Sequence, residues 1–152
     1  MGHTIKIKII KDLNMISHEF ERLSKQFSVF NSPLAMITEN IWRPPTDVYE
    51  TQDKIIIKME IAGIKMENFE IKLIGHTLII TGERHDEANE HKTNYKLMEI
   101  NYGYFEKMIP LPDNIDIENI QGLYDKGFIE IRLPKKIKSD ILVNIQFSQG
   151  DK

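Results

Sequence analysis

Two runs of alternating apolar and polar residues, 69–73 and 77–81, predict a β-hairpin near the middle of the chain. In the first run every second side chain is apolar, so one face of the strand is buried and the other faces water. In the second run Leu78 and Ile80 keep the same period, while Ile79 lies on the opposite face between Thr77 and Thr81. Gly75 supplies the dihedral freedom of a tight connection. We expect the second strand to end at Gly82 and the chain to return to solvent at Arg84. Because a two-stranded ribbon is not stable alone, further strands must cover its apolar face.

Short strands of the same kind recur through residues 42–136, with turns between them and no long helix. Further strands are predicted at 46–50, 54–61, 103–109, 120–124 and 128–133. Asp125-Lys126-Gly127, between the last two, is typical of a short hairpin turn. The polar stretch 85–94 is a long loop for a compact β domain, and a candidate short strand, Tyr95–Met98, follows it. The pattern predicts an all-β fold, an antiparallel β-sandwich.

In the first 41 residues the spacing of apolar side chains differs from that of the β region. Ile5, Ile7 and Ile9 alternate with lysines in a strand-like run whose partner the sequence does not identify. After Asp12, which can cap a helix, apolar residues recur every three or four positions and predict a helix over residues 12–30 with one apolar stripe. The stripe consists of Leu13, Ile16, Phe20, Leu23, Phe27 and Phe30. This helix either packs on its own domain or in a short coiled-coil seam, or it is an exposed arm that binds a partner surface.

Composition and charge narrow the class of protein. The 152 residues are 28% charged and 41% hydrophobic, which is typical of a soluble globular chain. A net charge of −3 argues against nucleic acid as the main partner, because phosphate binding favours a basic surface. No apolar run approaches membrane-spanning length, so we expect no membrane to be required. Cysteine is absent, which leaves no disulfide framework and no thiolate metal site, and a cytoplasmic location fits this composition.

The candidate chemistry is sparse. His76, His85 and His91 invite a metal interpretation because acidic residues stand near them, but the sequence has no His-x-x-x-His or HExxH spacing. It also lacks a GxxxxGK[ST] phosphate loop, a GxGxxG turn and a GxSxG nucleophile elbow. We therefore predict no catalytic residue, no cofactor and no metal site, and expect that the chain is not an enzyme.

Five segments occur in an order and spacing that resemble the α-crystallin domain of the small heat-shock proteins, in its bacterial and archaeal form. They are WRPPTDVYE, KMEIAGIKMENFEIKL, TLIITGER, YKLMEINYGYFEKMIPLP and GLYDKGFIEIRLPKK, which span residues 42–136. The sequence departs from the family at Ala62, where proline is usual, at Ile100 and Lys107, where arginine is usual, and at Phe128-Ile129, where Val-Leu is usual. Lys107 keeps a positive charge but lacks the two-pronged donor of arginine, so the resemblance carries no bidentate ion pair to this position.

The resemblance implies three parts: an N-terminal arm at 1–41, an α-crystallin domain with an immunoglobulin-like β-sandwich at 42–136, and an extended C-terminal tail at 137–152. In this branch of the family a strand of the long loop, here Tyr95–Met98, pairs with the first strand of a partner, here Thr46–Tyr49. The result is a strand-swapped homodimer. The interface residues that the resemblance implies are Thr46, Val48, Tyr49, Tyr95, Leu97, Glu99 and Lys107.

The family also carries an Ile/Val-x-Ile/Val anchor near its C-terminus that joins dimers into larger oligomers. Two registers fit here, Val143-Asn144-Ile145 and Ile141-Leu142-Val143. We favour Val143 and Ile145, because the polar residue between them can face water while both are buried. By resemblance, the anchor lies in a groove of a neighbouring subunit, where Gly122 leaves room for it. The candidate lining residues are Ile71, Leu73, Ile120 and Leu123. The alternative is a last strand that folds back on its own domain.

The function that the resemblance implies is that of an ATP-independent holdase chaperone. Such a protein binds partly unfolded client proteins and prevents their aggregation under heat or other stress, here as a self-assembled oligomer with client contacts on the apolar stripe of the arm. A second hypothesis is a monomeric co-chaperone or adaptor of an ATP-driven chaperone, like the CS domains, which lack the loop strand and the anchor. A third, an enzyme on a β-sandwich, is disfavoured by the missing motifs.

Overall fold

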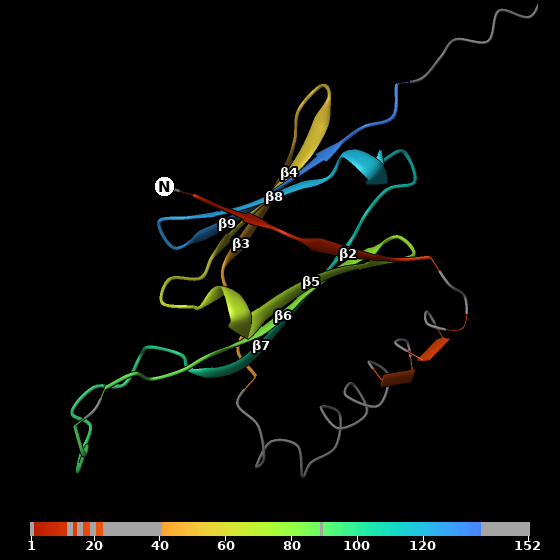
Figure 1. Cartoon of the computed structure of the whole chain (residues 1–152). Helices are drawn as coiled ribbons and strands as arrows, with labels where there is room; N and C mark the ends of the chain where they lie inside the picture. The colour runs from red at the N-terminus through yellow and green to blue at the C-terminus, as the bar shows by residue number, and fades with distance from the viewer. Residues whose placement is uncertain are drawn as a thin grey trace, which may run out of the picture.

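A computed structural model of the chain describes residues 2–11, 41–88 and 90–137, together with the helical positions 14, 17, 18, 21 and 22. Within these residues two β-sheets pack face to face (Figure 1). The first has five strands in the order β1 (His3–Ile5), β8 (Gln121–Asp125), β9 (Phe128–Pro134), β4 (Lys54–Glu60) and β3 (Thr46–Glu50). The second has four in the order β2 (Ile7–Ile10), β5 (Phe69–Ile74), β6 (Thr77–Arg84) and β7 (Gly103–Pro110). Short 3₁₀ turns, η2 (Met66–Asn68) and η3 (Ile117–Asn119), precede β5 and β8.

The core lies between the two sheets and is wholly apolar. Successive side chains of a strand point to opposite faces, so the predicted alternation places every second residue inside. No polar or charged side chain among the described residues is buried. Fully burying one large aliphatic side chain contributes roughly 1.5–3 kcal/mol, so this layer is the main source of stability. The buried side chains include Ile57, Met59, Ile71, Leu78, Ile80, Phe105, Ile129, Ile131 and Leu133.

The predicted sandwich is confirmed, and most strands begin and end within one residue of the expected positions. The hairpin turn between β8 and β9 is also confirmed. Lys126 and Gly127 have φ angles of 48° and 84°, and the flanking residues pair across the hairpin. Two successive positive φ angles define the type I′ turn, whose twist matches that of the strands it joins.

The prediction that the central hairpin ends at Gly82 is wrong. β6 continues to Arg84, which pairs with Gly103 on β7. The glycine is required inside the strand because of close packing rather than strand termination. A Cβ at Gly82 would lie 2.5 Å from the Asn68 carbonyl oxygen and 2.6 Å from the Phe105 ring.

The strand-like run near the N-terminus forms two strands that belong to different sheets. β1 pairs antiparallel with β8, and after Lys6 the chain continues as β2, which pairs parallel with β5. Figure 1 shows this segment in red, running from beside β8 to beside β5. Ile10 at its end packs with Ile74 and Ile79 in a small apolar cluster separate from the main core.

Two predicted parts fall largely outside the described residues. Of the predicted helix at 12–30, positions 14, 17, 18, 21 and 22 are described, and all are helical and exposed. The six residues of the apolar stripe and residues 138–152, which contain the anchor, lie outside the described residues.

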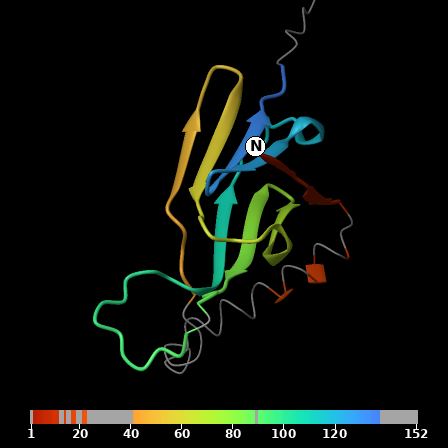
Figure 2. The ribbon, with the colours of Figure 1, turned by 60° about the vertical axis from the view of Figure 1, so that its left-hand side comes forward.

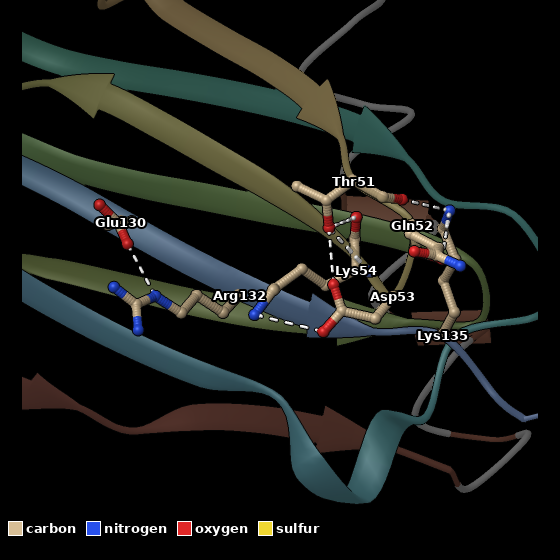
Figure 3. A network of polar contacts seen from close by, with 7 residues as sticks. All are labelled: Thr51, Gln52, Asp53, Lys54, Glu130, Arg132 and Lys135. Carbon is tan, nitrogen blue, oxygen red and sulfur yellow. Dashed lines mark hydrogen bonds and ion pairs between the residues drawn. The ribbon is translucent and has the colours of Figure 1, made fainter.

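The end of the domain is fastened to the turn between β3 and β4 (Figure 3). The Lys135 ammonium donates to the Thr51 carbonyl oxygen at 2.7 Å and pairs with Glu50, and the Lys135 backbone N–H donates to the Asp53 carbonyl oxygen at 2.8 Å. The Thr51 hydroxyl donates to the Asp53 carboxylate at 2.9 Å, and this hydrogen bond lowers the pKa of Asp53. The chain therefore leaves the sandwich from this corner.

Candidate interaction surfaces

β3 is the last strand of the five-stranded sheet, and within the described residues it pairs with β4 alone. Val48 and Tyr49 are 51% and 47% exposed, and Thr46 is half-buried. An edge strand of this kind presents backbone N–H and C=O groups that can pair with another chain. Three residues of the predicted dimer interface thus lie together on a strand that can accept a further one.

The connection between β6 and β7, residues 85–102, is a long loop that projects away from the sandwich (Figure 2). In the single chain Tyr95–Met98 forms no strand. Leu97 and Ile100 are 74% and 61% exposed, and Tyr95 is also exposed. Scattered apolar residues are normal on a surface, but this group is close together in sequence on one projecting segment. A strand here would need an edge on a second copy, so the loop strand stays a prediction.

Arg84 fastens the base of this loop to the entry of the sandwich. Its guanidinium lies 4.1 Å from the centre of the Trp42 ring and 5.7 Å from that of Tyr102. Its Nε donates to the Asn101 carbonyl oxygen at 2.8 Å, and Nη1 donates to the Ala62 carbonyl oxygen at 3.1 Å. Stacking and several simultaneous hydrogen bonds use the planar head of arginine, which lysine lacks.

A second link holds the start of the loop. The Lys65 ammonium and the Glu87 carboxylate lie 2.6 Å apart. This contact lowers the pKa of Glu87 and raises that of Lys65. Beneath the loop base is a hollow of about 650 Å³, whose wall includes Glu99 and Ile100. The C-terminal end of the loop, at Glu99 and Ile100, therefore lies beside the sandwich.

The predicted interface residues Glu99 and Lys107 are not brought together. Lys107 is half-buried on β7, opposite Ile80 of β6, whereas Glu99 is exposed on the loop. Neither residue takes part in an ion pair within the described part of the chain. Contact between them would require a second copy, and an exposed pair contributes only about 0–1 kcal/mol.

Two titratable groups on β7 are half-buried. Burial raises the pKa of the Glu106 carboxyl and of the Tyr104 hydroxyl. The positive charges of Arg22 and Arg43 act in the opposite direction on Glu106. Arg22 belongs to the predicted arm, so one described position of the arm lies near β7.

The space between β5 and β8, to which the resemblance assigns the anchor groove, is occupied by another segment of the same chain. β8 and β5 lie at the side of the sandwich away from β3, and the predicted lining residues come from these two strands and the residue before β8. Ile71 and Leu73 are fully buried, Ile120 is half-buried, and Leu123 is 39% exposed. The two β5 residues belong to the main core, and β2 pairs alongside them.

The N-terminal segment fills the space above Gly122. Ile5 is paired with Gly122, and Ile7 is paired with Ile71 across the groove. A Cβ built on Gly122 would lie 3.1 Å from the Ile5 Cβ and 3.5 Å from the Ile7 Cδ1. The room that Gly122 leaves is therefore taken by two side chains of the same chain.

The described residues contain no group of three or more histidine, aspartate or glutamate side chains placed to bind a metal ion. No helix among the described residues has the length and apolar character needed to cross a bilayer.

Comparison with known proteins defines the class of protein. Residues 47–146, more than half of the chain, match the Hsp20/alpha crystallin family. This chain belongs to that family, whose members are the small heat shock proteins, known as chaperones. The resemblance found in the five sequence segments is thereby confirmed.

Individual relatives support the same assignment. Small heat shock protein C2 of Rickettsia felis is 31% identical over 134 residues, which cover 86% of each chain. Heat shock protein 16.0 of Schizosaccharomyces pombe has a solved structure with a TM-score of 0.58 and 29% identity, covering 70% of this chain and 99% of that one. A small heat-shock protein from Xylella fastidiosa has a TM-score of 0.60 at 24% identity, covering 72% of this chain and 98% of that one, which is a likeness of fold.

Sequence reasoning missed two features of these surfaces. The alternation at 5–9 predicts a strand. It does not predict that this strand lies between β5 and β8, because a strand pattern does not identify the strand it pairs with. Arg84 stood in a matching segment, TLIITGER, and was expected in solvent. Its role depends on Trp42, 42 positions earlier in the chain, and on a carbonyl at Asn101.

Proposed function

We propose that this protein is an ATP-independent holdase chaperone that works as an oligomer built from strand-swapped dimers. Membership of a chaperone family supports this, and so does one structural observation. An exposed apolar loop segment, 95–100, and an open strand edge, β3, occur on the same chain. Each is a liability for an isolated monomer, and pairing between two copies covers both.

The swapped dimer is the arrangement that the family resemblance implies, and the exposed loop segment and the open edge of β3 are compatible with it. Residues 95–98 would add to the free edge of β3 on the partner by backbone hydrogen bonds, with Leu97 packing on Val48 or Tyr49. Both segments are present on each copy, so one two-fold arrangement forms the contact twice. Glu99 and Lys107 would adjust this interface rather than create it.

Client binding is assigned to the apolar stripe of the arm. Three phenylalanines and three aliphatic residues on one helical face require a covering surface, which partly unfolded proteins also provide. In the resting oligomer the arms and tails would cover one another, and heat or client would shift the assembly toward species that expose them. This mechanism needs no nucleotide, cofactor or catalytic residue, and we place it in the cytoplasm.

The alternative, a monomeric adaptor of the CS-domain kind, is less well supported. A monomer gains nothing from a long loop whose aliphatic side chains are exposed, or from a Val-x-Ile segment in its tail. The two functions differ in a simple observable, the mass of the particle in solution.

The test measures particle mass by light scattering on the full chain and on Val143→Ala/Ile145→Ala, together with aggregation of a heat-labile client without nucleotide. We expect a large oligomer that protects the client and that shrinks to dimers in the variant. The matched control is Asn144→Ala, whose side chain is expected to face water and whose loss is expected to leave the mass unchanged.

A monomeric full-length protein that protects no client would contradict the proposal and favour the adaptor. If the double substitution leaves the mass of the oligomer unchanged, the contacts between dimers do not depend on Val143 and Ile145.

A further inference from the structure

The groove between β5 and β8 holds a short segment of the same chain. Residues 3–10, named here the N-terminal clasp, contain β1 on the edge of β8 and β2 on the edge of β5. We propose that the N-terminal clasp is the resident occupant of the groove and competes with the C-terminal anchor of another copy. This inference rests on the proposed function, since it requires that the anchor binds in this groove.

The clasp has the same side-chain pattern as the anchor. Ile5-Lys6-Ile7 has two branched aliphatic residues around a polar one, as Val143-Asn144-Ile145 does. In the structure Ile5 is buried, Ile7 is half-buried and Lys6 is exposed. The clasp thus shows, within one chain, how the groove receives an extended segment with alternate aliphatic side chains.

The groove has room for one such segment. Ile5 and Ile7 both lie within 3.5 Å of the position that a Cβ on Gly122 would take. The close packing of a protein interior leaves no space for a second pair of aliphatic side chains there. An anchor can therefore enter only where the clasp has left.

The clasp and the anchor would also use the same strand edges for backbone hydrogen bonds. β1 uses the edge of β8, and β2 uses the edge of β5, so both outer ladders on this side of the sandwich are taken by the clasp. A segment that binds by strand addition needs one of these edges. The competition therefore concerns hydrogen bonds as well as side-chain space.

Two features make the clasp displaceable. β1 and β2 are only 3 and 4 residues long. β2 pairs in parallel, which is slightly less stable per residue than antiparallel pairing. Because the clasp is tethered to the domain, it nevertheless competes at a high effective concentration.

The test uses full-length chains that carry Val143→Ala/Ile145→Ala, so that the chain's own anchor does not compete. The probe is a fluorescent peptide of residues 137–149, titrated by anisotropy. Thr4→Cys/Leu123→Cys locks the clasp, because Thr4 and Leu123 are paired and both exposed, and the natural sequence has no cysteine. Directly opposed residues of an antiparallel pair lie within the Cα separation that a disulfide spans.

We expect the oxidised, locked chain to bind the peptide at least tenfold more weakly than the same chain after reduction. Ile5→Ser/Ile7→Ser, which weakens the clasp, should bind at least tenfold more tightly than its parent. The matched control His3→Ser/Lys6→Ser changes two exposed clasp residues and should bind like the parent.

Equal affinity in the locked, reduced and Ile5→Ser/Ile7→Ser chains would overturn the competition, even if the anchor binds. Disulfides between copies rather than within one chain, seen on a non-reducing gel, would overturn the assignment of the clasp to its own domain. A peptide that binds none of these variants would overturn the docking of the anchor itself, which is a failure of the proposed assembly.

Discussion

Two glycines of the central hairpin are required for different physical reasons. Gly82 lies within β6, where a Cβ would meet the Asn68 carbonyl oxygen at 2.5 Å. Gly75 lies in the turn with a φ of 58°, and nothing lies within 4 Å of the position of its Cβ. The first position lacks space, and the second has space but requires a left-handed backbone.

We predict that Gly82→Ala lowers the free energy of unfolding by about 3 kcal/mol, because a backbone atom and a core ring must move. Gly75→Ala should cost only about 1 kcal/mol, the strain of a left-handed alanine. Urea unfolding followed by fluorescence of Trp42, the single tryptophan of the chain, measures both. A larger loss for Gly75→Ala would contradict this account of the hairpin.

Glu106 is the residue for which the structure predicts a pH dependence. Burial raises the pKa of its carboxyl, so the folded state binds the proton more tightly than the unfolded state. The resulting cost to stability is fully present above the raised pKa and disappears as the pH falls below the ordinary value. Because the group is only half-buried, screening by solvent keeps that cost small.

Glu106→Gln should therefore be slightly more stable than the parent at pH 7, with the difference vanishing toward pH 4. Thermal melts across this range measure it. The control Glu130→Gln should give no gain at pH 7, because it removes a carboxylate that lies 2.7 Å from the Arg132 guanidinium (Figure 3). A loss of stability at pH 7 in Glu106→Gln would show that its contacts outweigh its burial.

At the scale of elements, the loop between β6 and β7 is long but held at its base. Arg84 stacks on Trp42 and donates to the carbonyl oxygens of Asn101 and Ala62. These contacts join the two ends of the loop, while its middle remains exposed. Because Arg84 makes most of these contacts, we expect local opening of the loop to increase when its side chain is changed.

Arg84→Lys keeps the charge but loses the planar fork and the stacked face. We predict several-fold faster chymotrypsin cleavage at Tyr95 and Leu97 in this variant, with little change in the cleavage of the sandwich. Arg132→Lys, on the outer face of β9, is the matched control and should leave loop cleavage unchanged. Identical cleavage rates in the parent, Arg84→Lys and Arg132→Lys would show that Arg84 does not hold the base of the loop.

At the scale of the whole molecule, the two sides of the sandwich differ in whether their strand edges are covered. The side formed by β5 and β8 is covered by the N-terminal clasp of the same chain, whereas β3 is left open within the described residues. Exposed edges invite association, so the open side is where a second copy is expected to bind first. The covered side becomes available only after a rearrangement.

Tyr95→Asp/Leu97→Asp should weaken the dimer at least about tenfold, because each aspartate would bury a charge on the edge of β3. Analytical ultracentrifugation in the Val143→Ala/Ile145→Ala background measures this equilibrium without larger assemblies. Both residues are exposed in the single chain, so the melting temperature of the monomer should not change. Lys96→Asp is the control, since its side chain points to the other face of the paired strand. A dimer that tolerates the double substitution would place the interface away from the loop.

The sequence by itself determined the sandwich. Strand period, apolar faces and turns are local properties, so runs such as Phe69–Ile74 and the Lys126-Gly127 turn predict their own structure and most of the core. The positions of the groove and of the strand that a partner would pair with were implied by the family resemblance and not by the strand pattern.

Only the tertiary structure decided which segment lies where between these strands. Backbone groups on an open edge are the same in every strand, and the 3–10 segment and the tail both carry aliphatic residues two apart, so alternation alone cannot choose between them. The fit of Ile5 and Ile7 over Gly122, and of Arg84 onto Trp42, joins residues far apart in the chain. Such contacts are decided by packing in three dimensions, which is why the occupied groove and the fastened loop were found in the structure and not in the sequence.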